Sequence, residues 1–198
     1  MNKKKQQKSL SVRLQLRDAT QARHAAVHTH PLFSRLLASD IAEAELAAIN
    51  FAHLRAFTQI EAARDALSLW PDLSLAHRIR ALRADLSAPP EILPEAYAYT
   101  AAYILGGLYV AYGSAFGARM IVKALRRALP DAAVTYYEMN DPQAWHLLCT
   151  RLEHLEGRSV GHAIDGANAV FDALLLTPAS RRLHARRAHV DDTPSHPL

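Results

Sequence analysis

The chain has 198 residues, half of them hydrophobic, with a formal net charge of +4 and a single cysteine, Cys149. This length and apolar content suffice for one domain with a sizeable core, and one cysteine excludes an intramolecular disulfide and a zinc site built from several cysteines. Four lysines among the first eight residues account for the whole net charge, so the rest of the chain is close to neutral. We therefore infer no nucleic-acid partner from the charge.

The ends of the chain differ in composition from its middle. We expect residues 1–9 to be a disordered basic arm, 10–188 to be a single helical domain and 189–198 to be a C-terminal tail. The basic start has no apolar segment after it, so it is not a secretory signal. The uncharged stretch 96–118 is long enough to span a bilayer, but it is rich in alanine, glycine and tyrosine and leads into a basic run, so we do not interpret it as a membrane span. These features predict a cytoplasmic protein.

Alanine and leucine are abundant and glycine occurs only seven times, which predicts an all-α fold. Apolar periodicity and prolines predict helices over residues 10–28, 41–70, 73–86, 101–129 and 160–176, and a further helix that starts at the turn 140–142 and stops at Gly157. Residues 31–39 are expected to form a connecting loop, and Ser39 or Asp40 to cap the second helix. We find no repeat and no strand pattern.

Three glycines lie on one stripe of the helix expected over residues 101–129. Gly106, Gly113 and Gly117 are seven and then four residues apart, which places them on one side of a helix. Each costs about 1 kcal/mol relative to alanine, so we expect something to approach this backbone closely. Two candidates remain open: a second helix, or a flat ligand, for which Gly113 and Gly117, with Ser114 beside them, would leave a strip free of side chains.

Among the eleven histidines, His24 is the candidate metal ligand. It lies at the apolar margin of the first expected helix, with Thr20 one turn before it and Arg13 and Arg17 on the same side. One imidazole leaves the opposite side of a haem iron open, as oxygen binding requires. The chain has no P-loop, no dinucleotide fingerprint and no Glu-x-x-His pair, which argues against nucleotide-binding and di-iron proteins.

Two segments resemble a known family. Residues 16–24, LRDATQARH, resemble the start of the bacterial biliverdin-producing haem oxygenases, whose first helix has the pattern L-R-x-A-T-x-x-x-H and ends in the proximal histidine. Residues 109–117, YVAYGSAFG, are similar to the distal-helix pattern Y-V-x-x-G-S-x-x-G of that family. The order and separation of the two segments also fit, and Trp145 after an aromatic pair resembles the family's later region, so the likeness covers about residues 14–176.

The resemblance implies a haem-oxygenase-like fold, with haem between the first helix and a kinked glycine-rich helix, and with His24 on the iron. Haem contacts are expected from Arg17, Thr20, His24, Tyr112, Gly113 and Gly117, and the catalytic surface from Gly113, Ser114 and Gly117. The implied reaction cleaves haem to biliverdin, carbon monoxide and ferrous iron with O₂. Electrons would come from an external donor such as a ferredoxin or a flavin reductase, because the chain has no flavin or nicotinamide motif.

Other interpretations stay open. The family often has an acidic residue where this chain has Tyr112, and some members have glycine where it has Ala118, which would suit a haem carrier or sensor without turnover. A thiaminase-like enzyme on a similar helical fold would use Cys149 as nucleophile. A helical interaction protein with a tightly packed glycine stripe would not bind haem. Candidate anchors for the haem propionates are Arg13, Arg17, Arg23, Lys123 and Arg127.

Overall fold

The computed structural model describes residues 11–87, 89–94 and 99–176, and this part of the chain is helical, without a strand. The expected all-α class is confirmed. The longer helices are α1 (Val12–Thr29), α2 (Glu43–Ala66), α3 (Ala76–Asp85), α4 (Ala101–Gly113), α5 (Ala118–Ala128), α7 (Pro142–Glu153) and α8 (Arg158–Leu175), joined by the short helix α6 (Thr135–Glu138) and the 3-10 helices η1 (Phe33–Leu37), η2 (Pro71–Leu73) and η3 (Ser114–Gly117). The expected arm 1–9, the tail 189–198 and residues 177–188 lie outside the described residues.

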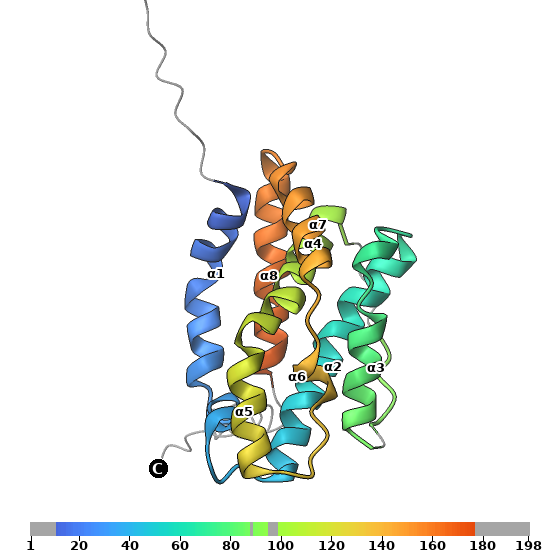
Figure 1. Ribbon diagram of the computed structural model, residues 1–198. Coiled ribbons are helices and arrows are strands. Elements are labelled where there is room, and N and C mark those ends of the chain that lie inside the picture. Colours follow the sequence, from blue (N-terminus) through green and yellow to red (C-terminus); the bar gives the residue numbers. More distant parts are fainter. Residues whose placement is uncertain (1–10, 88, 95–98, 177–198) are drawn as a thin grey trace, which may run out of the picture.

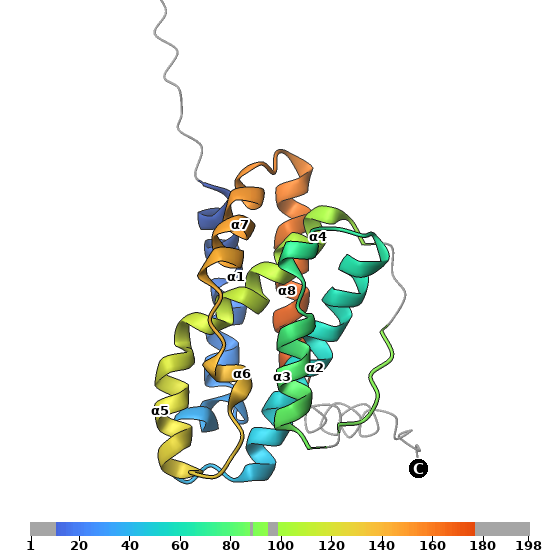
Figure 2. The ribbon, with the colours of Figure 1, turned by 45° about the vertical axis from the view of Figure 1, so that its right-hand side comes forward.

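Helix α8 is the centre of the bundle (Figures 1 and 2). α4, α1 and α2 all pack against it, and the contact between α4 and α8 is the most extensive in the molecule. α3 packs on α2, and α7 packs on α4. The chain enters α5 from α4 through η3, so the beginning of α5 follows directly from a helix that is fixed in the core.

The start of α1 is capped by a side chain from α7. Glu153 accepts hydrogen bonds from the backbone N–H of Val12 (3.0 Å) and Arg13 (3.2 Å) and from the hydroxyl of Ser11 (2.8 Å). A carboxylate at a helix N-terminus satisfies free N–H groups and suits the helix dipole. This contact fixes α1 against α7 at one end, while Pro31 ends the helix at the other, as the sequence predicted.

Helix α2 does not begin as expected, and the predicted cap at Ser39 or Asp40 is wrong. The N-cap residue is Ala42, whose N–H donates to the Glu45 carboxylate at 2.9 Å. The carboxylate of Asp40 instead pairs with Arg35 at 2.9 Å. Residues 31–39 include the 3-10 helix η1 rather than being loop throughout, and α2 ends before residue 70. Ser68 and Trp70 beyond it have φ values of 51° and 40°, which a helix cannot continue through.

The helix expected over residues 101–129 is interrupted. The 3-10 helix η3 separates α4 from α5, and this produces the expected kink. One stretch of the described chain, Ala101–Ala128, is apolar and long enough for a membrane span, but 56% of its most apolar 18 residues is buried inside the bundle. A core helix passes the same test, so this stretch is weak evidence for a membrane protein.

The first glycine of the stripe serves helix packing. A Cβ added to Gly106 of α4 would lie 1.8 Å from the carbonyl oxygen of Ala163 in α8. The contact is reciprocal, because a Cβ on Gly166 of α8 would lie 1.9 Å from the carbonyl oxygen of Tyr103 in α4. The two backbones are therefore in direct contact, and a close helix explains Gly106.

Candidate functional site

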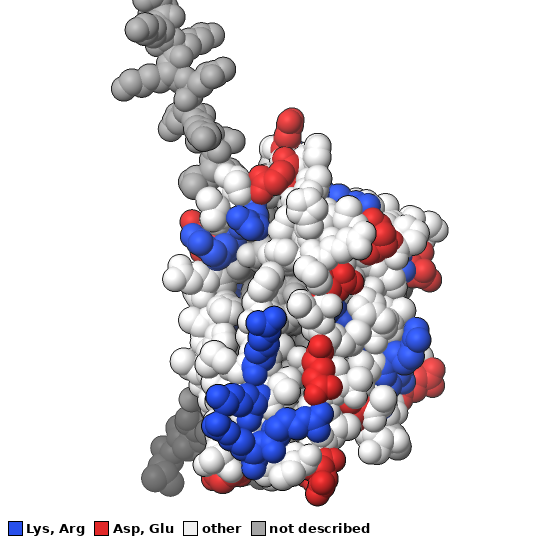
Figure 3. Space-filling model, viewed as in Figure 1, with Lys and Arg blue, Asp and Glu red and all other residues white. Residues whose placement is uncertain are grey.

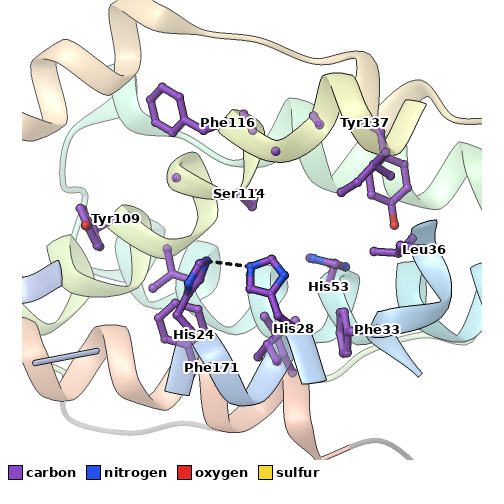
Figure 4. Close-up of a pocket in the computed structure, with 18 of the residues that line it drawn as sticks. His24, His28, Phe33, Leu36, His53, Tyr109, Ser114, Phe116, Tyr137 and Phe171 are labelled. Carbon is purple, nitrogen blue, oxygen red and sulfur yellow. Dashed lines mark hydrogen bonds between the residues drawn. The ribbon is translucent and has the colours of Figure 1, made fainter. Parts of the chain in front are cut away.

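A cavity of about 970 Å³ lies between α1 and the segment η3–α5. Residues of η1, α2, α3, α4, α6, α7 and α8 complete its walls, and most of the lining is apolar. Figure 4 shows three histidines, His24, His28 and His53, along one side of the cavity, with Ser114 and Phe116 across from them. Cavities that hold small molecules and cofactors are mostly apolar, with a few polar groups that converge on the ligand.

His24 lines the cavity from α1. Its ring stands edge-on to Phe171 of α8, with 5.8 Å between the ring centroids. Burial lowers the pKa of this imidazole, and the neighbouring His28 lowers it further. Both effects favour the neutral imidazole, which is the form that binds a metal.

Gly113, Ser114 and Gly117 also line the cavity, and Figure 4 shows Ser114 across from His24. A Cβ added to Gly117 would have no atom within 4 Å, and one added to Gly113 would meet only the ring of Trp145, at 3.8 Å. The hydroxyl of Ser114 donates to the carbonyl of Ala111 at 2.8 Å. Gly117 thus differs from Gly106, because the space beside it is open, whereas Gly113 stands in ordinary contact with Trp145 of α7, which also lines the cavity.

Thr20 and Arg17 also line the cavity, on the turns of α1 before His24. The hydroxyl of Thr20 donates to the carbonyl of Leu16 at 2.8 Å, so it adds little polarity to the wall. Arg17 is exposed and pairs with Asp18 at 3.0 Å. An exposed pair of this kind is weak, about 0–1 kcal/mol, and can exchange for another anion.

Tyr112 does not belong to the cavity wall. It is 2% exposed, its ring lies 4.8 Å from the guanidinium of Arg78, and its hydroxyl donates to the carbonyl of Ser74 at 3.1 Å. The side chain therefore faces α3 and η2 rather than the cavity. We correct the expected haem contact at this residue on that ground.

Two residues that sequence reasoning missed line the cavity at its buried side. His53 of α2 is 7% exposed, and its Nδ1 donates to the carbonyl of Ile49 at 3.0 Å. Arg78 of α3 is 1% exposed, and its Nε has no hydrogen-bond partner among the described residues. His53 stands at the helical spacing of the apolar residues of the second helix, which is a sequence signal for burial, whereas Arg78 lies in a basic stretch and has no such signal.

His53 should make the stability of the protein depend on pH. Burial lowers the pKa of His53 to about 4, from 6.5 when it is exposed. Between these values the unfolded chain binds a proton that the folded chain does not, so stability falls as the pH falls through this window. Urea titrations should show that the contribution of this residue to the free energy of unfolding is lower by about 2.5 kcal/mol at pH 4.5 than at pH 7.

The matched variant is His53→Phe, which keeps a ring among Phe33, Phe57 and Tyr136. Its loss of stability between the two pH values should be smaller than that of the wild type by about the same 2.5 kcal/mol. Replacing the exposed His146 by glutamine should leave the dependence of stability on pH as it is in the wild type. An equal pH dependence in wild type and His53→Phe would contradict the assignment.

A polar group lies beside Ser114. The hydroxyl of Tyr136 is 3.0 Å from the Ser114 hydroxyl, and since the Ser114 proton goes to a carbonyl, Tyr136 is the donor of this pair. Burial raises the pKa of Tyr136, so the phenol stays protonated. Arg78 and His53 line the same cavity, which therefore combines apolar walls with a small set of buried polar groups.

No group of three or more His, Cys, Asp or Glu side chains in the described part of the chain could hold a metal ion. A metal bound at His24 would have to bring its other ligands with it, as the iron of a porphyrin does.

Cys149 of α7 is half-buried and does not line the cavity. Burial raises its pKa, which lowers the fraction of reactive thiolate. The geometry gives no support to a cysteine nucleophile in this cavity.

Comparison with known proteins reveals a match at the level of structure. No family model matches the chain, and no relative was found among the curated proteins. Solved structures do match it over most of its length. The chain has the fold of haem oxygenases.

Three of these structures show the extent of the likeness. Haem oxygenase-1 of the cyanobacterium Synechocystis, in complex with haem, is 14% identical with a TM-score of 0.64, and the match covers 93% of this chain and 100% of that one. The haem oxygenase of Leptospira interrogans is 16% identical with a TM-score of 0.64, and the match covers 84% of this chain and 97% of that one. The NO- and CO-bound haem oxygenase of Neisseria meningitidis is 19% identical with a TM-score of 0.58, and the match covers 84% of this chain and 91% of that one. At these identities the likeness concerns the fold.

Proposed function

We propose that this protein binds haem in the cavity and cleaves it to biliverdin, carbon monoxide and ferrous iron, using O₂ and electrons from an external donor. One observation carries the proposal. His24, whose surroundings favour the neutral imidazole, lines a mostly apolar cavity together with Gly113 and Gly117, which carry no side chain. The likeness to solved haem oxygenases, one of them in complex with haem, supports it.

The residues present fit haem. The cavity of about 970 Å³ is at the upper end of the range for small-molecule sites, about 300–1,000 Å³. His24 would hold the iron, and the aromatic and aliphatic side chains of the walls would contact the ring. Since the space beside Gly117 is open, a planar molecule can approach the backbone of η3.

The propionates of haem need cations at the mouth of the site. Of the five candidate anchors, Arg17 lines the cavity, whereas Arg23 is engaged with Asp172 of α8 at 2.8 Å. Figure 3 shows a group of basic side chains over α5, where Lys123 and Arg127 are exposed and form no ion pair with the described residues. We assign Arg17 as an anchor, with the exposed cations of α5 attracting the anionic ligand from solution.

When bound, haem supplies the redox chemistry of O₂ activation and is also the substrate. The protein binds and orients it. Gly113 at the end of α4 and Gly117 of η3 carry no side chain, so they would leave room for haem and for O₂ beside this stretch of backbone. The Tyr136 hydroxyl holds a proton beside Ser114, and Arg78 keeps a buried positive charge at the same cavity. An electron donor such as a ferredoxin or a flavin reductase is required, because no flavin or nicotinamide motif occurs in the chain.

Haem titration tests this proposal. Purified protein should bind one equivalent of haem, with the Soret band of a histidine-ligated iron. Addition of a reductant under air, with catalase present to remove free peroxide, should convert this band to the spectrum of a bilin and release carbon monoxide. Stable haem that is never converted would indicate a carrier or sensor instead. Absence of stoichiometric binding would exclude both.

A further inference from the structure

Helix α1 presents two imidazoles to the cavity, where the sequence motif predicted one. His24 and His28 both line it, their Nε2 atoms are 3.1 Å apart, and their rings meet edge to face with 4.5 Å between centroids. Figure 4 shows the two rings side by side, with His28 between His24 and His53. The spacing of four residues places them on one face of the helix, one turn apart.

We propose that His28 is a second, alternative ligand for the haem iron on the same side of the ring as His24. This inference rests on the haem binding proposed above. The sequence resemblance implied one histidine, His24, on the iron, whereas the structure offers two on the same side.

The distance between the two nitrogen atoms carries the first step. A bond between a metal ion and an imidazole nitrogen is about 2.0–2.1 Å long. Two nitrogens that are 3.1 Å apart are therefore closer together than two bond lengths, so an iron that is bound by one nitrogen is within reach of the other after a small rotation of the side chains. To pass from one ligand to the other, the iron needs to move along α1 by no more than the distance between the two Nε2 atoms.

The porphyrin makes the two ligands mutually exclusive. Its four nitrogens fill the plane around the iron and leave one ligand position on each face. His24 and His28 come from the same helix and the same side, so only one can bind at a time. The expected behaviour is an exchange between two singly ligated states, with the opposite face still open for O₂.

The hydrogen bond between the rings argues against a supporting role for His28. A histidine that supports a metal ligand accepts a proton from the other ring nitrogen of that ligand, the one that does not bind the metal. Here the contact joins Nε2 to Nε2, so it occupies both nitrogens that point into the cavity. Iron binding to either Nε2 must break it, and the remaining imidazole is then left beside the iron.

The surroundings of the two rings differ, so the two states should not be equivalent. His24 packs edge-on against Phe171 of α8, which orients it. The ring contact of His28 is with His24. We expect His24 to be the main ligand in the wild type and His28 to hold the iron when His24 is absent.

The test uses four proteins: wild type, His24→Ala, His28→Ala and the double variant. Ferric haem is titrated into each, and the iron–histidine stretching band of the ferrous state is recorded by resonance Raman spectroscopy. Each single variant should keep this band, at a shifted frequency in His24→Ala, with the Kd for haem raised about tenfold or less. The double variant should lose the band and bind about a hundredfold more weakly or worse.

The controls separate ligation from loss of side chain and from misfolding. Gln21 lines the same wall of the cavity, so His24→Ala combined with Gln21→Ala should keep the iron–histidine band. Circular dichroism should show four folded proteins, since His24 and His28 are exposed on a helix and alanine favours helix. Loss of the band in His24→Ala alone would overturn the proposal about His28. Failure of the wild type to bind haem would instead overturn the proposed function.

Discussion

Gly106→Ala should lower the free energy of unfolding by about 3 kcal/mol or more. The added methyl group would lie 1.8 Å from the carbonyl oxygen of Ala163 and 2.9 Å from the N–H nitrogen of Ala167. Both are backbone atoms of α8, which cannot turn aside as a flexible side chain would. To accept the methyl group, α4 and α8 would have to separate along the most extensive helix contact of the bundle. Urea unfolding followed by circular dichroism measures the loss.

The chain offers a matched control on α8. Gly161 also lies within a helix, but it is exposed and nothing stands within 4 Å of an added Cβ. Gly161→Ala should raise stability by about 0.5–1 kcal/mol, because alanine favours helix. Gly166→Ala, on the other side of the same contact, should lower the free energy of unfolding as much as Gly106→Ala does. Equal stability of the variants at Gly106 and Gly161 would show that α4 and α8 are not in backbone contact.

These glycines show where sequence reasoning ends. The spacing of Gly106, Gly113 and Gly117 identified a surface that something approaches, and it left both a helix and a flat ligand open as candidates. The structure divides the stripe, because Gly106 faces α8, whereas Gly113 and Gly117 line a cavity, Gly113 beside Trp145 and Gly117 beside open space. Spacing along one helix cannot reveal this division, since it depends on where a segment about 60 residues later packs.

The helices themselves were largely predictable because their signals are local. Apolar periodicity and prolines placed all the longer helices within a few residues, apart from the break at η3 and the early end of α2. The cap of α1 had no local signal, because its carboxylate, Glu153, lies more than 140 residues away along the chain. The cap predicted at Asp40 failed because Arg35 binds that carboxylate.

The candidate site was predictable only in part. His24, Gly113 and Gly117 stood in recognisable motifs and do line the cavity. His53 and Arg78 reach it from α2 and α3, and their burial follows from tertiary packing rather than from neighbouring residues. A charged residue on the polar side of an amphipathic pattern is normally exposed. Arg78 departs from this rule, because its guanidinium packs over the ring of Tyr112.

Gly117→Leu should weaken haem binding at least about tenfold while leaving the fold intact. The backbone at Gly117 has φ −86° and ψ −11°, a helical conformation that any L residue adopts, and no atom lies within 4 Å of an added Cβ. The leucine therefore causes no strain in the free protein. It does place four carbons in the space where the ring of haem would approach η3.

A graded series makes this test specific. Gly117→Ala adds one carbon and should weaken binding less than leucine, whereas Gly161→Leu, exposed on α8 outside the cavity lining, should not change the affinity. Haem titration gives the Kd, and urea unfolding of the haem-free variants shows whether the fold is retained. A Gly117→Leu protein with unchanged affinity and stability would mean that haem does not lie against η3. Loss of affinity at unchanged stability would instead show that the backbone at Gly117 contacts the ligand. The Gly106→Ala experiment shows in the same way that the backbone at Gly106 contacts α8.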